Sequence, residues 1–386
     1  MSTFPPVKRN ILLNPGPSTT TDTVKYAQII PDICPREKEF SGVMKEVHDG
    51  LVKIAHGNLN DHACVLFCGS GTIVDDACIN SFLPKDTKAL VVDNGTYSDR
   101  AIEILTYYGL PYEAIKFPTT ALAEPAKIEE VIKKNQEDKS KVPFGFVYMT
   151  HQETGIGILN PLREIGAVCH KYNLPLIADT ISTFAMIPID IEKDNVDVIT
   201  GSAQKGIMAM SGLSFLIAKK SLIEASKDYP KRSYYNNVYR QYKYFEKTGQ
   251  MNFTAPVQTI YAALQGIKEY FAEGEEEKWK RHRSVMEEIH KGEDEIGFKE
   301  LIPRNIQSQL VSTLVYPDDP NWNFDKIHDY CYERGFTLYP GISKDVNTFR
   351  ICSLGAIYPK DIQEFWKVFK EALKAYNVTV PLKYDK

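Results

Sequence analysis

The chain has 386 residues, of which 43% are hydrophobic, so it is long enough to bury a large core and to form one large domain with a smaller one. Its 46 basic and 50 acidic residues are interspersed and give a net charge of −4, which argues against nucleic-acid and membrane-surface partners. Seven scattered cysteines without a C-x-x-C pair, a start unlike a signal peptide and the lack of a long apolar run predict a cytoplasmic protein without disulfides or a metal site.

Short apolar runs alternate with longer amphipathic stretches from about residue 63 onward. The runs predict strands that are buried on both faces, at 63–67, 88–93, 144–150, 174–180 and 197–202, with a further strand at 212–220. This alternation predicts an α/β fold with a mainly parallel central sheet flanked by helices. Ligands of such sheets collect beyond the carboxyl ends of the strands, so the chemistry is expected at that edge.

The remainder of the chain predicts a smaller α+β domain at the C-terminal end. The stretch at 229–245 is polar and Tyr-rich, and it is expected to be a loop at a partner surface. Helical spacing at 256–271 precedes a charged run, and strands are predicted near 309–317 and 347–353, with a closing helix at 360–376. We expect an N-terminal arm (1–20), a large domain (21–265) and a small domain (266–386).

The first candidate for chemistry is Gly69-Ser70-Gly71-Thr72, between a predicted strand and a predicted helix. The free N–H groups and the dipole of a helix N-terminus attract anions, glycines permit close approach, and the hydroxyls of Ser70 and Thr72 add donors. The loop therefore predicts a phosphate site. A Gly-rich turn that merely caps the helix explains it equally well.

Asp179 and Lys205 end two further apolar runs. A carboxylate that leaves a buried strand needs a cationic or hydrogen-bonding partner, although Asp179 could also cap the next element. A lysine among small residues at a strand end can have its pKa lowered by burial, which suits it to Schiff-base chemistry, although most lysines are surface charges. A phosphate loop, an Asp and a Lys in this order at one sheet edge favour a cofactor site.

Seven segments resemble those of class V aminotransferases, in the same order. These segments are NILLNPGPSTTT near the start, GSGT at 69–72, HQETGIGILNP at 151–161, IADTISTF at 178–184, SAQKG at 202–206, NFTAPVQTIYAAL at 252–264 and NTFRICSLG at 347–355. The resemblance spans nearly the whole chain. It implies fold type I, the cofactor pyridoxal 5'-phosphate and, within the class, enzymes that transaminate 2-aminoethylphosphonate with pyruvate.

The resemblance also implies a role for each matched residue. Lys205 would carry the cofactor and Asp179 would pair with its ring nitrogen. The phosphate would be held by Ser70, Gly71, Thr72 and Gln204, and by Thr254 of a neighbouring subunit, which implies a homodimer with shared active sites. Tyr97 would stack on the ring and Thr154 would bind near the ring oxygen, although an ordinary buried aromatic and a turn cap are the simpler explanations.

Arg350 matches the arginine that binds the acidic group of the substrate, and its apolar neighbours make a surface ion pair a poorer explanation. Gly155, Ile156 and the segment 31–40 depart from the pattern of the phosphonate enzymes. An alanine:glyoxylate or serine:pyruvate aminotransferase therefore remains an alternative. A lyase of the cysteine desulfurase type is more distant, because it needs a nucleophilic cysteine in a mobile loop and Cys352 lies in a predicted strand.

Overall fold

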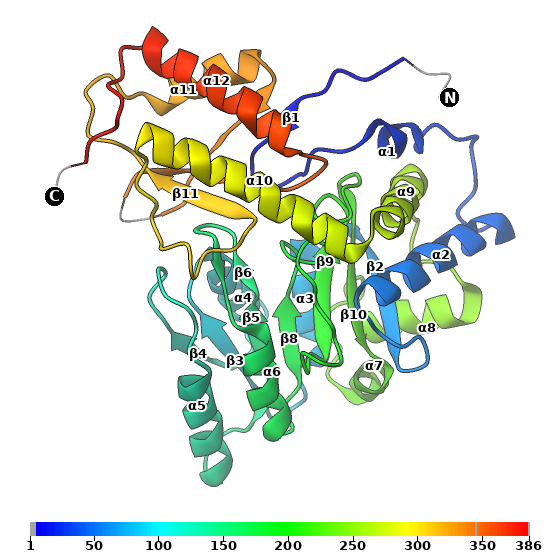
Figure 1. Ribbon diagram of the computed structural model, residues 1–386. Helices are drawn as coiled ribbons and strands as arrows, with labels where there is room; N and C mark the ends of the chain where they lie inside the picture. Colours follow the sequence, from blue (N-terminus) through cyan, green and yellow to red (C-terminus); the bar gives the residue numbers. More distant parts are fainter. Residues whose placement is uncertain (1–4, 344–345, 385–386) are drawn as a thin grey trace.

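The computed structural model describes residues 5–343 and 346–384 (Figure 1). Its centre is a seven-stranded sheet in the order β2-β10-β9-β8-β5-β3-β4. The bounds are β2 His62–Gly69, β3 Lys88–Asp93, β4 Tyr112–Lys116, β5 Phe144–Thr150, β8 Leu176–Asp179, β9 Val198–Ser202 and β10 Gly212–Lys219. Only β10 runs antiparallel to its neighbours in this sheet. The predicted α/β fold with a mainly parallel central sheet is confirmed.

Helices cover both faces of the sheet because its strands are apolar throughout. Alternate strand residues enter two cores: Val92, for example, packs in one core and Val91 in the other. The first core includes α2 (Lys38–Ile54), α5 (Pro125–Glu137), α6 (Leu162–Lys171) and α9 (Val257–Glu273). The second includes α3 (Thr72–Phe82), α4 (Thr96–Tyr107), α7 (Lys220–Ala225) and α8 (Val238–Thr248). The continuous apolar runs of the sequence follow from this burial on two sides.

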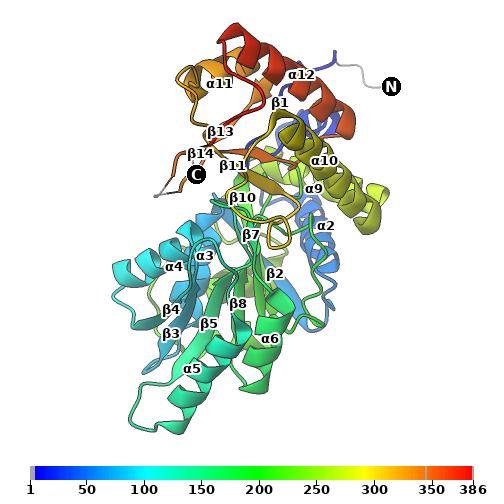
Figure 2. The same ribbon diagram turned by 60° about the vertical axis from the view of Figure 1, so that its left-hand side comes forward.

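A smaller domain lies beyond the carboxyl edge of the sheet in both ribbon views (Figures 1 and 2). It contains the antiparallel sheet β11-β14-β13, which is formed by Val311–Val315, Thr348–Cys352 and Tyr339–Pro340. Its helices are α10 (Glu275–Ile296), α11 (Phe324–Glu333) and α12 (Pro359–Ala375), which share a separate core with that sheet. The two domains therefore have cores of their own and meet where ligands are expected.

The N-terminal arm and the domain boundary show how the two parts are joined. In the arm, β1 (Ile11–Leu12) pairs in parallel with β12 (Phe336–Thr337), so the arm adds to the small domain. The predicted boundary after residue 265 falls inside α9, which packs in the first core of the large domain. We propose instead that the boundary lies at Gly274, which separates α9 from α10.

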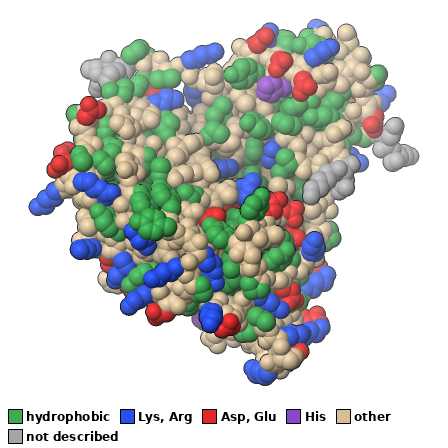
Figure 3. Space-filling view, turned by 180° about the vertical axis from the view of Figure 1, so that it is seen from behind, with side chains coloured by type: hydrophobic (Ala, Val, Ile, Leu, Met, Phe, Trp, Pro, Cys, Tyr) green, Lys and Arg blue, Asp and Glu red, His purple; other side chains and the backbone are tan. Residues whose placement is uncertain are grey.

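The surface agrees with the charge pattern of the sequence. On the face in Figure 3, basic and acidic side chains are both present among hydrophobic and uncharged ones. No helix among the described residues is both long enough and apolar enough to cross a membrane. The Tyr-rich stretch differs from its predicted loop, because α8 takes its second half, with Asn237 accepting a hydrogen bond from the Arg240 amide at the start of the helix.

Candidate active site

The phosphate loop, Asp179 and Lys205 lie at one edge of the central sheet. Strands β2, β8 and β9 all point the same way, since β8 and β9 are parallel and β10 is antiparallel to both β2 and β9. Gly69 and Asp179 are the last residues of β2 and β8, and Lys205 follows closely on the end of β9. The topology thus brings together residues that are far apart in the sequence.

Lys205 lies in a tight turn under the N-terminal arm. Its Nζ donates a hydrogen bond to the Pro15 carbonyl, and a Cβ on Gly16 would lie 2.5 Å from Nζ, so only glycine fits there. The Ser18 hydroxyl donates to the Lys205 carbonyl at 2.9 Å. Burial, together with the positive charge of Arg350, lowers the pKa of Lys205 to about 8. The Cys352 thiol and Asp179 oppose this shift. A lysine in this state is a competent nucleophile toward an aldehyde.

Asp179 forms a buried carboxyl pair with Asp75 of α3. Burial raises the pKa of Asp179. The Ile181 amide, which donates a hydrogen bond to Asp179 Oδ1 at 2.9 Å, and the charges of nearby cations partly offset this rise by lowering the pKa. Burial and the charge of Asp179 raise the pKa of Asp75 much further. The Thr200 hydroxyl donates to Asp75 at 3.4 Å. We assign the negative charge to Asp179 and a proton to Asp75, because two adjacent buried carboxylates do not both ionise readily.

The loop before α3 offers an anion the exposed Ser70 hydroxyl at a helix N-terminus, although some of the loop's other polar groups are already hydrogen-bonded. Ser70 is exposed, and the Ile73 and Val74 amides already bond the Ser70 and Gly71 carbonyls. Gly71 packs closely on Ile181, the residue that binds Asp179, because a Cβ there would lie 2.9 Å from the Ile181 Cδ1. Arg100 donates from Nη1 to the Thr72 hydroxyl at 3.2 Å and thus brings a positive charge to the loop. This donor set suits a phosphate.

Tyr97 and Thr154 come from neighbouring segments at the same edge. The Arg100 guanidinium lies 4.7 Å from the centroid of the Tyr97 ring. Glu153 fixes the start of α4, since its carboxylate accepts hydrogen bonds from the Tyr97 and Ser98 amides at 3.0 and 2.8 Å. Thr154 is fully buried, and its hydroxyl lies 2.7 Å from that of Ser182. Glu153 therefore holds the backbone of Tyr97, and Ser182 holds the side chain of Thr154.

Arg350 lies on β14, opposite Thr313 of β11, and is only 4% exposed. Its guanidinium donates to the carbonyls of Thr154 at 3.1 Å and Pro340 at 2.9 Å, while its Nε has no hydrogen-bond partner in the described part of the chain. Within those same residues Arg350 forms no ion pair. A buried guanidinium without a carboxylate partner is suited to an anionic ligand.

Gln204 and Thr254 are placed differently from the rest. The Gln204 side chain accepts a hydrogen bond from the Ser202 hydroxyl at 2.6 Å, next to Lys205. Thr254 is exposed on the loop between α8 and α9, and none of the hydrogen bonds that hold the site together involves it. The single chain thus leaves Thr254 facing outward.

Four features of the site had little or no sequence signal. Residues 14–18 of the arm carry no sequence signal beyond their place in a family segment, yet they cover Lys205. Asp75 and Arg100 appear as ordinary helix charges in the sequence. Lys278, within a charged run, is buried and donates to the Gly206 carbonyl at 2.6 Å, so α10 of the small domain supports the Lys205 turn.

The donor set fits pyridoxal phosphate. A nucleophilic lysine and a buried carboxylate lie at the same sheet edge as a helix N-terminus that carries the hydroxyls of Ser70 and Thr72. These groups match the aldehyde, the ring nitrogen and the phosphate of that cofactor. The unpaired Nε of Arg350 adds a site for a further anionic group. We therefore treat the predicted roles as proposals that the geometry supports.

Comparisons with known proteins agree with this arrangement. A family model described as aminotransferase class-V matches residues 25–320. A bifunctional phosphonoacetaldehyde hydrolase/aminoethylphosphonate transaminase of Clostridioides difficile is 33% identical over 372 residues; these cover 96% of this chain but only 57% of that protein. A 2-aminoethylphosphonate–pyruvate transaminase of Phocaeicola vulgatus is 31% identical, with 94% of this chain and 99% of that protein covered.

Solved structures share the fold at low sequence identity. A ureidoglycine–glyoxylate aminotransferase of Bacillus subtilis superimposes with a TM-score of 0.87 at 19% identity, covering 97% of this chain and 95% of that one. A cysteine desulfurase of Thermococcus onnurineus gives 0.73 at 14% identity, with 95% of each chain covered. These likenesses establish fold type I, and with the family match and the relatives above they show that the chain belongs to the class V aminotransferases.

Proposed function

We propose that the protein transaminates 2-aminoethylphosphonate with pyruvate, giving phosphonoacetaldehyde and L-alanine, or catalyses the reverse reaction. The observation that carries this proposal is Arg350, a buried guanidinium with no ion-pair partner among the described residues, beside the proposed cofactor lysine. An amino donor with a phosphonate and an acceptor with a carboxylate both offer it an anion. Relatives that match nearly the full length of the chain are named for this reaction.

The proposed cofactor is pyridoxal 5'-phosphate. Lys205 would hold its aldehyde, Asp179 its ring nitrogen, and Ser70, Gly71, Thr72 and Gln204 its phosphate, with Tyr97 against the ring and Thr154 near the ring oxygen. Arg100 supports the phosphate loop through its bond to Thr72. When bound, the cofactor supplies an electron sink for the carbon that loses its proton.

The residues of the chain would then move and hold protons. The Lys205 amine would remove the proton from the substrate carbon and later return one, acting first as base and then as acid. Its pKa of about 8 leaves part of the amine neutral near pH 7, as a base requires. Asp179 keeps a proton on the ring nitrogen, and the neutral Asp75 beside it avoids a second negative charge.

The assembly and location are also proposals. A homodimer would place Thr254 on the cofactor phosphate of the partner subunit, and its exposure in the single chain is compatible with that role. Tyr234, which precedes α8, is 68% exposed, and Tyr235 stacks on Phe253, the residue before Thr254. Seven free cysteines, five of them buried, favour the reducing cytoplasm.

The cysteine desulfurase alternative is disfavoured by Cys352. This thiol is fully buried within β14, and burial raises its pKa to about 12 against the charges of Arg350 and Lys205. A nucleophilic cysteine needs exposure and a lowered pKa. Transamination is therefore the reaction that the site supports.

An amino-donor panel tests the substrate. The holoenzyme is given pyruvate with 2-aminoethylphosphonate, serine or taurine, and glyoxylate with alanine or serine, and the carbonyl product of each donor is measured. We expect 2-aminoethylphosphonate to give the highest kcat/KM, because a phosphonate carries more charge for Arg350 than a carboxylate. Faster turnover of alanine or serine with glyoxylate would overturn the substrate proposal and leave the aminotransferase assignment intact.

A further inference from the structure

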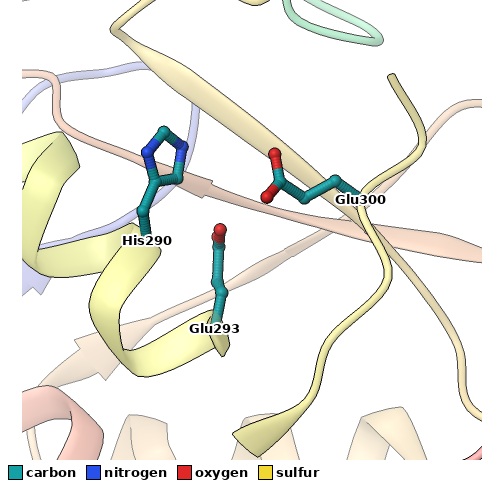
Figure 4. A group of neighbouring side chains, drawn as sticks. All are labelled: His290, Glu293 and Glu300. Carbon is teal, nitrogen blue, oxygen red and sulfur yellow. The ribbon is translucent and has the colours of Figure 1, made fainter. Parts of the chain in front are cut away.

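Three side chains of the small domain converge away from the proposed active site. His290 and Glu293 are three residues apart on α10, so they share one face of the helix, and Glu300 comes from the segment that leads toward β11 (Figure 4). One potential ligand atom from each of these residues lies within 4.8 Å of those of the other two. One imidazole and two carboxylates thus surround a common point.

Glu293 is the unusual member of this cluster. It has no exposed surface, and neither carboxylate oxygen has a hydrogen-bond partner in the described part of the chain. The cation of Arg304 lies 3.8 Å from Glu293 Oε2, which is too long for a hydrogen bond. Arg304 instead binds Glu300 at 2.6 Å and Asp294 at 2.7 Å. A buried carboxylate in this state is costly unless something binds it.

A protonated Glu293 is the simplest alternative. Burial raises its pKa to about 8, with the Ser312 hydroxyl opposing the shift, so the side chain could be neutral. A neutral acid still carries an O–H donor. The Ser312 hydroxyl faces Glu293 closely enough to affect its pKa, but the two groups do not form a hydrogen bond, and both lack a partner among the described residues. The geometry is therefore better explained by a ligand than by a proton alone.

We propose that His290, Glu293 and Glu300 bind a divalent transition-metal ion, for which Zn²⁺ is the best fit. Zinc accepts imidazole nitrogen and carboxylate oxygen together, whereas magnesium and calcium prefer oxygen alone. His290 Nε2 is hydrogen-bonded to the side-chain oxygen of Gln307 at 3.0 Å, and the ion would replace this bond by binding both atoms. Ligands of a tetrahedral zinc ion are about 3.4 Å apart, so the partly exposed His290 and Glu300 close slightly on the buried Glu293.

Such an ion would join α10 to the strand β11. The cluster spans the last turns of the long helix and the segment that returns to the small sheet, two elements on which the domain core depends. Binding to the folded state alone stabilises it. The role is structural and does not depend on the proposed transaminase reaction.

Zinc binding by the holoenzyme tests the proposal. Wild type, Glu293→Gln, His290→Asn and the control Glu295→Gln are dialysed against Zn²⁺, and bound metal per chain and the unfolding midpoint are measured. Glu295 lies on the same helix but is exposed and pairs with Lys370, so its variant controls for loss of one carboxylate. We expect about one specific ion per chain and a raised midpoint for wild type and control. Glu293→Gln should lose both, and His290→Asn should bind at least 10-fold more weakly.

The outcomes separate the possibilities. Glutamine has the shape of the neutral acid, so Glu293→Gln should fold, which retention of the cofactor absorbance checks. Equal zinc binding by wild type and Glu293→Gln would place the ion elsewhere, for instance on the exposed Cys34 thiol, and overturn the proposal. Absence of binding to wild type would overturn it as well.

Discussion

Two buried lysines at the domain junction show that charge state alone does not identify a catalytic residue. Burial lowers the pKa of Lys205 to about 8 and that of Lys278 to about 7. The lower value belongs to Lys278, yet its Nζ is bound to the Gly206 carbonyl behind the Lys205 turn. Lys205 instead lies near Asp179 and Arg350, which contribute to its pKa shift. The position of Lys205 close to Asp179 and Arg350 therefore identifies it, and not Lys278, as the candidate catalytic lysine.

We predict that borohydride reduction of the holoenzyme attaches the cofactor to Lys205. Peptide mapping should find the modified residue there and not at Lys278. Lys205→Ala should lose the visible absorption band of the bound cofactor and all measurable turnover, because it removes the amine that is proposed to hold the aldehyde. Lys278→Met should keep the band. A reducible, coloured Lys205→Ala protein would contradict the assignment.

Arg350 gives a second prediction at this scale. Arg350→Ala should leave the cofactor spectrum intact and raise KM for both amino donor and keto acid. Loss of a charge-assisted bidentate contact from a buried site costs on the order of 2 to 5 kcal/mol, or roughly 30-fold to several thousand-fold in kcat/KM. Arg350→Lys should recover only part of this, because an ammonium cannot form the planar fork. An unchanged kcat/KM for Arg350→Ala would remove it from substrate binding.

At the scale of elements, the sequence predicts those strands whose residues are buried. It does not predict features that depend on which strand pairs with which. The strands β2, β3, β5, β8 and β9 were predicted because each is a continuous apolar run. β4 was missed because it is an edge strand with exposed and charged residues, YEAIK. Strand β10 was predicted, but its antiparallel direction is not encoded in its apolar pattern.

In the candidate site, too, the sequence predicts residues that follow a buried strand and misses residues whose surroundings are distant in the sequence. Lys205, Asp179 and the GSGT loop were found because each follows a strong strand signal. Asp75 and Lys278 are surrounded by residues distant in sequence, so only the folded chain shows that they are buried. The position of the arm over Lys205 likewise depends on the pairing of β1 with β12, 325 residues away along the chain at Ile11 and Phe336.

The N-terminal arm leads to an element-scale prediction. Gly16 has φ of 130°, and a Cβ there would contact the Lys205 side chain. Gly16→Ala should displace the arm or the lysine, lowering kcat/KM by about 10-fold or more while the fold is kept, since such backbone strain costs about 1–3 kcal/mol. Gly42→Ala is the control, because no atom lies within 4 Å of a Cβ there. Circular dichroism and kinetics check both variants, and equal kcat/KM in the two would show that the arm has no role at the site.

For the whole molecule, the question is whether one chain completes the site. Every predicted cofactor residue except Thr254 lies at the carboxyl edge of the sheet or in the segments beside it, whereas Thr254 is exposed. Hollowed surface next to its loop is lined by basic and aromatic side chains, including Lys231, Tyr239 and Arg240. In the proposed homodimer, we expect a second copy of the chain to cover this surface and to bring each Thr254 to the other site.

We predict that two inactive variants complement each other. Thr254→Asp should repel the cofactor phosphate of the partner subunit, and Lys205→Ala disables its own site. In a mixed dimer, the site with an intact Lys205 receives the intact Thr254 from the other subunit. Refolding the variants together in equal amounts should therefore restore about one quarter of the sites, because half of the dimers are mixed and each has one complete site. Each variant refolded alone serves as the control. If the mixture shows only the average activity of the two variants, or if sedimentation finds a fully active monomer, the shared site is excluded.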